Sequence, residues 1–207
     1  MQFPLPITPE MSVAGARLAT MTTQYYTASS IDGFIADSDN SLSWLFQFSE
    51  PSGMEDEYPR FIAEVGAMAM GSTTYEWVAE HTGFLNDPSK WEYDVPTWVF
   101  SSRELPRVEG PDVRFVSGDV VPVHEEMLRA AEGRNVWLVG GGDLVGQFHD
   151  QGLLDEVIIG MASVTLGSGA PLLPRRIVTP PLHLLGATAY GADFVMLRYA
   201  VRKTSET

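Results

Sequence analysis

Three consecutive glycines stand between an apolar run and a stretch with helical spacing in NVWLVGGGDLVGQF, residues 135–148. Glycine lets backbone N–H groups approach a ligand closely, and the N-terminus of a helix attracts negative charge. Residues 140–144 therefore form a candidate phosphate-binding turn. A plain strand-to-helix turn is the alternative, because Val145 stands where the usual dinucleotide fingerprint has its third glycine.

A second junction of this type occurs in MGSTTYEWV. Gly71 ends an apolar run, and the hydroxyl residues Ser72, Thr73 and Thr74 follow it at the start of a predicted helix. Taken alone, these residues would be ordinary helix caps. A dinucleotide that lies across the carboxyl ends of parallel strands needs two such junctions, so the pair favours a dinucleotide-binding site.

Two serines and an arginine, Ser101, Ser102 and Arg103, follow the apolar run in VFSSRELP. A guanidinium group binds phosphate through two parallel hydrogen bonds. Arg103 is therefore a candidate reader of an adenosine 2′-phosphate. A surface arginine that contacts only water is the alternative.

Alternating strands and helices must position these segments. Apolar runs typical of strands that are covered on both faces lie at residues 23–29, 67–72, 97–102, 113–117, 135–140 and 156–162. Helical spacing lies at residues 54–65, 72–81, 122–131 and 143–152. This alternation predicts an α/β fold, a three-layer α/β/α sandwich around a mainly parallel sheet. The tail, residues 182–202, predicts an antiparallel hairpin at one edge.

Composition excludes several classes of partner and chemistry. The 207 residues include 13 Lys and Arg against 27 Asp and Glu, a net charge of −14, which disfavours nucleic acid and anionic membranes as partners. No run approaches the roughly 20 apolar residues of a membrane span. Cysteine is absent, which excludes thiolate catalysis and fits a cytoplasmic protein. The four histidines lack ligand spacing, so no metal site is expected.

One domain is expected at residues 23–203, preceded by an arm at residues 1–22. The arm contains several prolines and lacks the basic start and continuous apolar core of a signal peptide. We expect the arm to be flexible, with ordering against a partner subunit as the alternative.

Five segments carry a resemblance to a known family: YYTASSIDGFIAD, AMAMGSTTYEW, WVFSSR, NVWLVGGGDLVGQFHDQGLLDEVII and LGSGAPLLP. In this order and spacing they resemble the dihydrofolate-reductase-like superfamily. Within it, they are similar to the bacterial branch related to the reductase domain of bifunctional riboflavin biosynthesis proteins. The resemblance covers residues 23–202, and its strongest elements are the MG-x-x-T-Y and V-G-G-G segments together.

The resemblance implies an NADPH-dependent reductase that transfers hydride to a C=N bond. Its leading named activity is 5-amino-6-(5-phosphoribosylamino)uracil reduction. Dihydrofolate or pterin reduction is the enzymatic alternative, and an NADPH-binding protein without turnover is the alternative of a different class. A homodimer is expected as well, because the tail hairpin leaves an apolar edge that a second copy could cover.

The resemblance also implies roles for individual residues. The backbone of Ala28 and Ile35 would contact the nicotinamide carboxamide. Two groups would hold the pyrophosphate: Gly71, Ser72, Thr73 and Thr74, and Gly140, Gly141, Gly142, Asp143 and Leu144. Ser101, Ser102 and Arg103 would surround the 2′-phosphate. The family often has arginine where this chain has Ser72, which leaves the preference for NADPH dependent on Arg103.

The catalytic and substrate-binding residues follow the resemblance less closely. Asp32 in SIDGF matches the riboflavin-type reductases as a substrate-positioning acid, whereas an Asp-Gly turn is the alternative. Glu50, with Trp44 nearby, stands where folate reductases carry a carboxylate, with a helix-starting acid as the alternative. Candidate partners for a substrate phosphate are Arg60, Arg175 and Arg176, with solvated surface arginines as the alternative. Folate reductases join two adjacent glycines by a cis peptide, so one is expected within residues 140–142.

Overall fold

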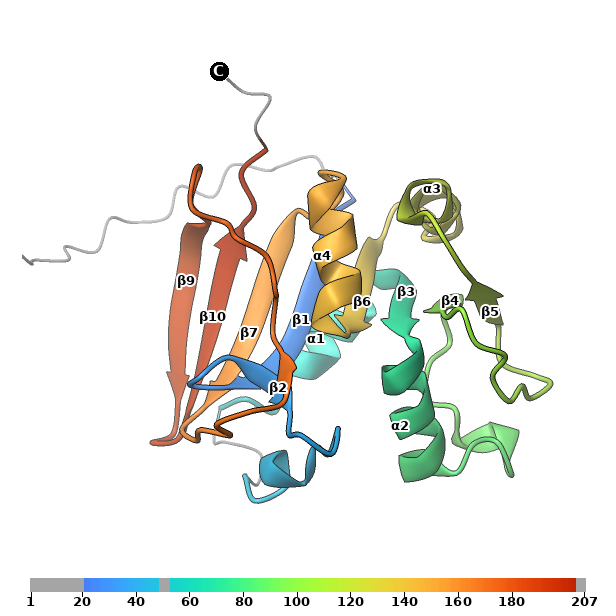
Figure 1. The fold of residues 1–207 in the computed structure, drawn as a ribbon, viewed down its shortest axis with the longest axis horizontal. Coiled ribbons are helices and arrows are strands. Elements are labelled where there is room, and N and C mark those ends of the chain that lie inside the picture. The colour runs from blue at the N-terminus through green and yellow to red at the C-terminus, as the bar shows by residue number, and fades with distance from the viewer. Residues whose placement is uncertain (1–20, 49–52, 204–207) are drawn as a thin grey trace, which may run out of the picture.

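The computed structural model describes residues 21–48 and 53–203. Within these residues the chain forms an eight-stranded main sheet and a small sheet of two strands (Figure 1). The main strands are β1 (Thr23–Ser30), β3 (Val65–Gly71), β4 (Thr97–Phe100), β5 (Val113–Val116), β6 (Asn135–Gly140), β7 (Glu156–Ala162), β9 (His183–Tyr190) and β10 (Phe194–Ala200). The small sheet pairs β2 (Phe34–Ala36) with β8 (Ala170–Pro171).

The helices follow the predicted positions closely. They are α1 (Glu57–Ala63), α2 (Ser72–Thr82), α3 (Val120–Ala130) and α4 (Gly142–Asp150), with short 3-10 turns η1 (Ser43–Leu45) and η2 (Pro88–Lys90). The largest difference is α1, which is shorter at both ends than the pattern predicted. The short strands β2 and β8 have no periodic signal in the sequence and were not predicted.

The strands of the main sheet lie in the order β5-β4-β3-β6-β1-β7-β10-β9 (Figure 1). Every pair from β5 to β7 is parallel, whereas β10 is antiparallel to both β7 and β9. The mainly parallel sheet and the antiparallel tail hairpin are therefore confirmed. Because the parallel strands all end at the same edge, the junctions after β3, β4 and β6 lie along one line.

Alternating side chains on the central strands separate two cores. On β3, Ala67 and Ala69 face the core under α3 and α4, whereas Met68 and Met70 face the core under α2. All four side chains are fully buried. Burial on both faces explains the continuous apolar run that predicted this strand.

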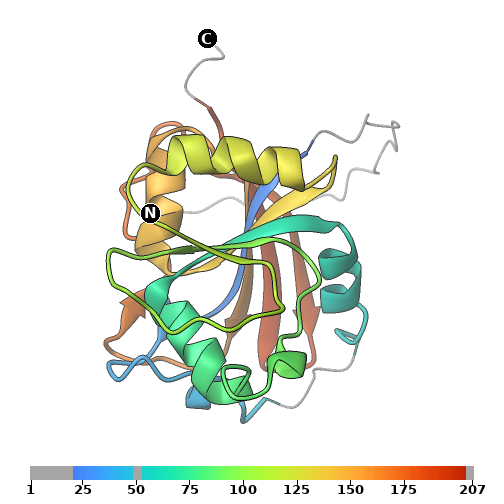
Figure 2. The same cartoon turned by 90° about the vertical axis from the view of Figure 1, so that its right-hand side faces the viewer.

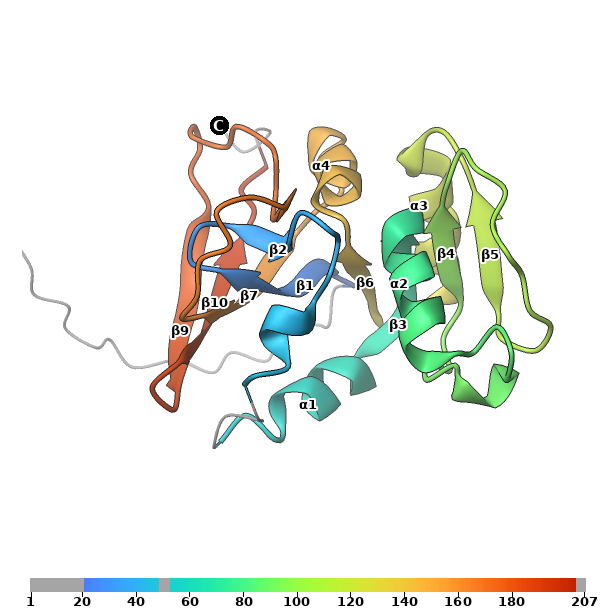
Figure 3. The same ribbon diagram turned by 60° about the horizontal axis from the view of Figure 1, so that its bottom comes forward.

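Helices cover both faces of the sheet, which confirms the three-layer fold. The core under α3 and α4 contains Met127 and Phe148, and Figure 2 shows these two helices next to each other. The opposite core contains Tyr75 of α2 and, at its border, Phe61 of α1. Figure 3 shows α1 and α4 on opposite sides of β1.

Strand β9 forms one edge of the main sheet, and Leu184 and Leu185 on it are more than half exposed. The homodimer expected at this edge stays a prediction. In the part of the chain that the structure describes, no helix is long and apolar enough to cross a membrane. Most of the expected N-terminal arm lies outside the described residues.

Candidate active site

A cavity of about 730 Å³ opens along the carboxyl ends of β1, β3 and β6. One end, the glycine end, is lined by Thr73, Thr74, Gly140, Gly141 and Gly142. The other, the aromatic end, is lined by Tyr26, Tyr58, Tyr93 and Trp137. This volume is in the range of small-molecule and cofactor sites.

The two helices that start at the cavity have no capping side chain. Gly71 and Gly141 are the N-caps of α2 and α4. Neither glycine has a side chain that could accept a hydrogen bond from the first N–H groups of its helix. By contrast, Asp119 caps α3 and accepts a hydrogen bond from Val121 N. Free N–H groups at a helix start bind anions, so the two glycine caps suit a pyrophosphate group.

The adjacent glycines Gly141 and Gly142 have different surroundings. A Cβ atom on Gly142 would lie 2.2 Å from the carbonyl oxygen of Pro171 and 2.5 Å from that of Leu172. The chain after β8 therefore needs a residue without a side chain at this position. A Cβ on Gly141 would meet no heavy atom of the described residues within 4 Å, which leaves open space beside its backbone.

The cis peptide expected within residues 140–142 is not present, and that prediction is wrong. The described residues contain one cis peptide bond, Thr179–Pro180. The chain instead turns from β6 into α4 through Gly141, whose φ is −37° and ψ is 146°. This extended backbone carries the turn with trans peptides.

The predicted nicotinamide contacts Ala28 and Ile35 both line the cavity. Ala28 is on β1, where it pairs with Gly160 of β7, another residue of the cavity lining. Ile35 is on β2, which pairs with β8 across the small sheet. A further hydrogen bond beside the two residue pairs of this sheet joins Leu172 N to Gly33 O at 2.9 Å. The small sheet thus holds Ile35 over the cavity.

The predicted adenosine contacts lie outside the cavity lining, at the end of β4. Arg103 forms a bidentate ion pair with Glu76 of α2, with N–O distances of 2.9 and 2.7 Å. Ser101 orders this turn, since its hydroxyl donates to Arg103 O and accepts from Arg103 N. Among the predicted pyrophosphate contacts, Leu144 is buried in the core and Asp143 pairs with Arg175.

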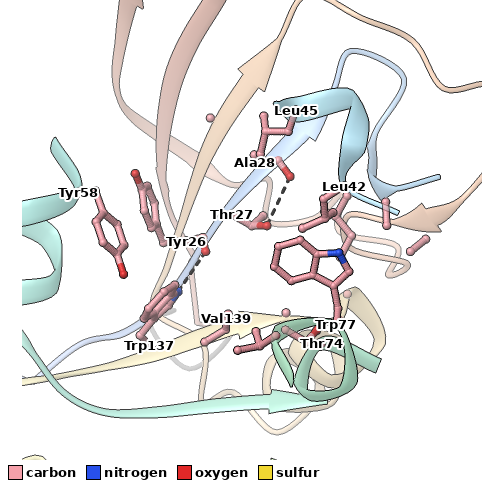
Figure 4. A pocket seen from close by; sticks show the side chains of 18 of the residues that line it. Tyr26, Thr27, Ala28, Leu42, Leu45, Tyr58, Thr74, Trp77, Trp137 and Val139 are labelled. Atoms are coloured by element: carbon pink, nitrogen blue, oxygen red, sulfur yellow. Dashed lines mark hydrogen bonds between the residues drawn. The ribbon is translucent and has the colours of Figure 1, made fainter. Parts of the chain in front are cut away.

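Figure 4 shows Tyr26 of β1, Tyr58 of α1 and Trp137 of β6 close together at the aromatic end, and Tyr93 of the loop before β4 also lines it. The Nε1 of Trp137 donates to Tyr26 O at 3.0 Å, and the rings of Tyr58 and Tyr93 lie 6.2 and 5.9 Å from that of Trp137. Burial raises the pKa of Tyr26 to about 12 and also raises the pKa of Tyr58. Both phenols are therefore protonated donors at neutral pH.

The segment around η1 is held over the cavity by ring stacking. Phe46 stacks on His81 and Trp77 of α2, with centroid distances of 5.3 and 6.4 Å. Leu42 and Leu45 from this segment line the cavity, whereas Trp44 packs against the core beside β10. Glu50, the predicted carboxylate near Trp44, lies outside the described residues.

The predicted phosphate partner Arg60 is not part of the cavity lining. Its guanidinium pairs with Asp56 one turn earlier, at 2.9 Å, and the side chain is 72% exposed. The two residues before Arg60 line the cavity instead. Among the described residues, no cluster of three metal-ligating side chains is found.

Asp32 holds a loop rather than facing the cavity. Its carboxylate accepts hydrogen bonds from the hydroxyl of Ser30 at 2.6 Å and from the backbone N–H groups of Leu166 and Gly167. Gly33 has a φ of 83°, and its N–H donates to Ser30 O, which completes an Asp-Gly turn. The geometry favours the turn interpretation, and a catalytic role for Asp32 stays a prediction.

The variant Asp32→Asn separates these two roles. The Ser30 hydroxyl, followed by the two backbone N–H groups, lowers the pKa of Asp32. A lowered pKa stabilises the fold above the unfolded value of about 3.9, and this stabilisation is lost as the pH falls through the folded value. We expect denaturant melts to show that Asp32→Asn is less stable than the wild type at pH 7. This difference in unfolding free energy should narrow below about pH 4. Ligand binding in the cavity should persist in the folded variant, whereas losing a substrate-positioning acid would weaken it.

Comparisons with known proteins agree with this geometry. The family model of the RibD C-terminal domain matches residues 77–196. The uncharacterized Bacillus subtilis protein YwjB is 32% identical over 177 residues, which cover 86% of this chain and 96% of YwjB. The uncharacterized protein YyaP of the same organism is 25% identical and covers 83% of this chain and 90% of its own.

Solved structures show the same fold. A Shewanella sp. PV-4 protein assigned by name to riboflavin biosynthesis has a TM-score of 0.72 at 24% identity, covering 88% of this chain and all of that one. The Thermotoga maritima bifunctional deaminase and 5-amino-6-(5-phosphoribosylamino)uracil reductase scores 0.60 at 16% identity, covering 88% and 57%. Dihydrofolate reductase from Enterococcus faecalis, solved with NADP(H), scores 0.56 at 13% identity, covering 88% and 97%.

The fold is therefore dihydrofolate-reductase-like, as the sequence resemblance implied. The family match covers more than half of the chain, and it begins within α2 and ends in β10. The chain belongs to the RibD C-terminal domain family.

Proposed function

We propose that this protein is a cytoplasmic, NADPH-dependent reductase that transfers hydride to a C=N bond of a small ring-containing substrate. The observation that carries the proposal is the cavity, which runs from two glycine-capped helix starts to a cluster of phenol and indole rings. Family membership and the reductases among the structural relatives support an oxidoreductase.

The residues present fit a nicotinamide dinucleotide. The open space beside Gly141 and the uncapped start of α4 suit the pyrophosphate, and Thr74 Oγ1 lies beside Gly140 at the neighbouring junction. Ala28 and Ile35 would contact the carboxamide through their backbone. When bound, NADPH supplies the hydride. Arg103 would read the 2′-phosphate after releasing Glu76.

The protein's own contribution is orientation, exclusion of water and proton supply. The apolar side chains Leu42, Leu45 and Val139 exclude water from the middle of the cavity. Orientation of the two reactants against each other supplies most of the rate enhancement in such a site. Tyr58 shares a hydrogen bond with Tyr93 and is a candidate donor of the proton to the reduced nitrogen.

The direct test is NADPH oxidation with three acceptors: 5-amino-6-(5-phosphoribosylamino)uracil, the same compound without its phosphate, and dihydrofolate. Oxidation that depends on any of them supports the reductase. If NADPH binds but none is reduced, the chain is a nucleotide-binding protein without turnover on these substrates. If NADPH does not bind, the proposed function is wrong.

The Glu76–Arg103 ion pair gives a specific prediction about cofactor choice. In Arg103→Ala the preference for NADPH over NADH should fall by on the order of tenfold, because one charge-assisted phosphate contact is lost. In Glu76→Gln the guanidinium is released, so the KM for NADPH should fall while the KM for NADH stays unchanged. The ratio of kcat/KM values for the two cofactors measures both effects. An unchanged ratio in Arg103→Ala would remove the 2′-phosphate assignment.

A further inference from the structure

The cavity has no positively charged lining. Among residues 21–48 and 53–203, no Lys or Arg lines it, whereas the carboxylates Glu55 and Asp143 do. Among the described residues, a phosphate group that enters this cavity would therefore meet no side-chain cation in the lining.

Two arginines that adjoin or pair with cavity-lining residues have carboxylate partners. Arg60 follows the cavity-lining Pro59, but its guanidinium lies 2.9 Å from Asp56 and is exposed. Arg175 lies 3.0 Å from Asp143 and 2.8 Å from Asp150, so two carboxylates compensate its charge. Both guanidinium groups already have carboxylate partners, so a phosphate would have to compete with these carboxylates for either arginine.

Further carboxylates act on the aromatic end. Glu57 adds to the effect of burial in raising the pKa of Tyr26, and Glu92 does so for Tyr58. Both carboxylates therefore act on the phenols of this end, beside Glu55 of the cavity lining. A phosphate monoester carries about −1.5 to −2 charges at neutral pH, so it would be repelled here.

We propose that the aromatic end takes a flat, neutral or cationic ring system that carries no phosphate. Ring faces and edges of Tyr26, Tyr58 and Trp137 stack against such a ring, and the phenol groups bond its polar edge. The proposal deepens the proposed function, on which it rests, by naming the substrate class. This substrate class differs from that of the Thermotoga maritima reductase, whose name specifies a phosphoribosyl substrate.

Riboflavin and FMN form a matched pair of probes, because they share one flat ring system and differ by a single phosphate. Stacking against tyrosine or tryptophan quenches flavin fluorescence, so binding is measured by titration without any turnover. We expect riboflavin to bind at least tenfold more tightly than FMN at low ionic strength. The difference should shrink in high salt, because added ions screen the repulsion.

The variant Glu55→Lys tests the location of the effect, with Glu55→Gln as its matched control. Glu55 is exposed at the cavity wall, so both variants should fold, which thermal melts check. Glu55→Lys should raise the ratio of FMN affinity to riboflavin affinity about fivefold or more, because it adds a cation within a Debye length of the phosphate that riboflavin lacks. Glu55→Gln should fall between it and the wild type.

Three outcomes would overturn the proposal: FMN bound as tightly as riboflavin, no quenching with either flavin, or a ratio of FMN affinity to riboflavin affinity that Glu55→Lys leaves unchanged. The last result would place the FMN phosphate at the glycine end. NADPH takes no part in these titrations. A failure to bind or oxidise NADPH would therefore contradict the proposed function while leaving the flavin comparison intact.

Discussion

Replacing Gly142 by alanine should lower the free energy of unfolding by about 1–3 kcal/mol and weaken NADPH binding strongly. The added methyl group would overlap the carbonyl oxygens of Pro171 and Leu172, which are backbone atoms and cannot rotate away. Tyr25 Oη also donates to Leu172 O at 3.0 Å, so the segment is held from two sides. Moving it would displace the start of α4 that forms the glycine end.

The matched control is Gly141→Ala at the neighbouring position. A methyl group there meets no atom of the described residues within 4 Å and points into open space at the cavity wall. Gly141→Ala should therefore melt like the wild type but bind NADPH less tightly. Thermal melts and NADPH titrations of the two variants measure both effects. Equal stability of Gly142→Ala and wild type would contradict the packing account.

Trp137→Ala should cost about 3–5 kcal/mol of unfolding free energy, the largest loss expected for a single cavity residue. Trp137 is 5% exposed, and its ring lies 5.3 Å from that of Phe61 in addition to its contacts with three tyrosines. At about 2–4 °C per kcal/mol, the melting temperature should fall by on the order of 10 °C.

Trp137→Phe is the control for this prediction. It keeps an aromatic ring in the core but removes the Nε1 donor to Tyr26 O. Trp137→Phe should lose much less unfolding free energy, roughly 1–2 kcal/mol in total. This loss combines about 0.5–1.5 kcal/mol for the single hydrogen bond with the cost of a small cavity. A melting temperature of Trp137→Ala within about 2 °C of the wild type would show that the aromatic end does not depend on this ring.

The sheet could be predicted from sequence because its signals are local. Strands covered on both faces read as continuous apolar runs, and β3 and β6 each end at a glycine just before a helix. The turn chemistry of Asp32 and Gly33 was also visible as an alternative. Tyr26 and Trp137 were not singled out from the sequence, although alternation along β1 and β6 places each on the face opposite to that of its neighbours in the strand.

The rest of the site depends on contacts between distant residues. Arg103 and Glu76 are 27 positions apart, and only the approach of α2 to the end of β4 brings them together. Gly142 has no room for a side chain because residues 171 and 172 lie against it. These residues are at the end of β8, a strand with no periodic signal. Tyr58 and Tyr93 come from a short helix and a long loop, so their meeting at Trp137 follows from topology alone.

Energy transfer from tryptophan to reduced nicotinamide tests the central claim most directly. Trp77 and Trp137 both line the cavity, so excitation of tryptophan should produce nicotinamide emission when NADPH is bound there. The account predicts a saturable signal that NADP⁺ displaces and that is weakened in Gly141→Ala. The absence of energy transfer at millimolar NADPH, in protein whose melts show an intact fold, would contradict it.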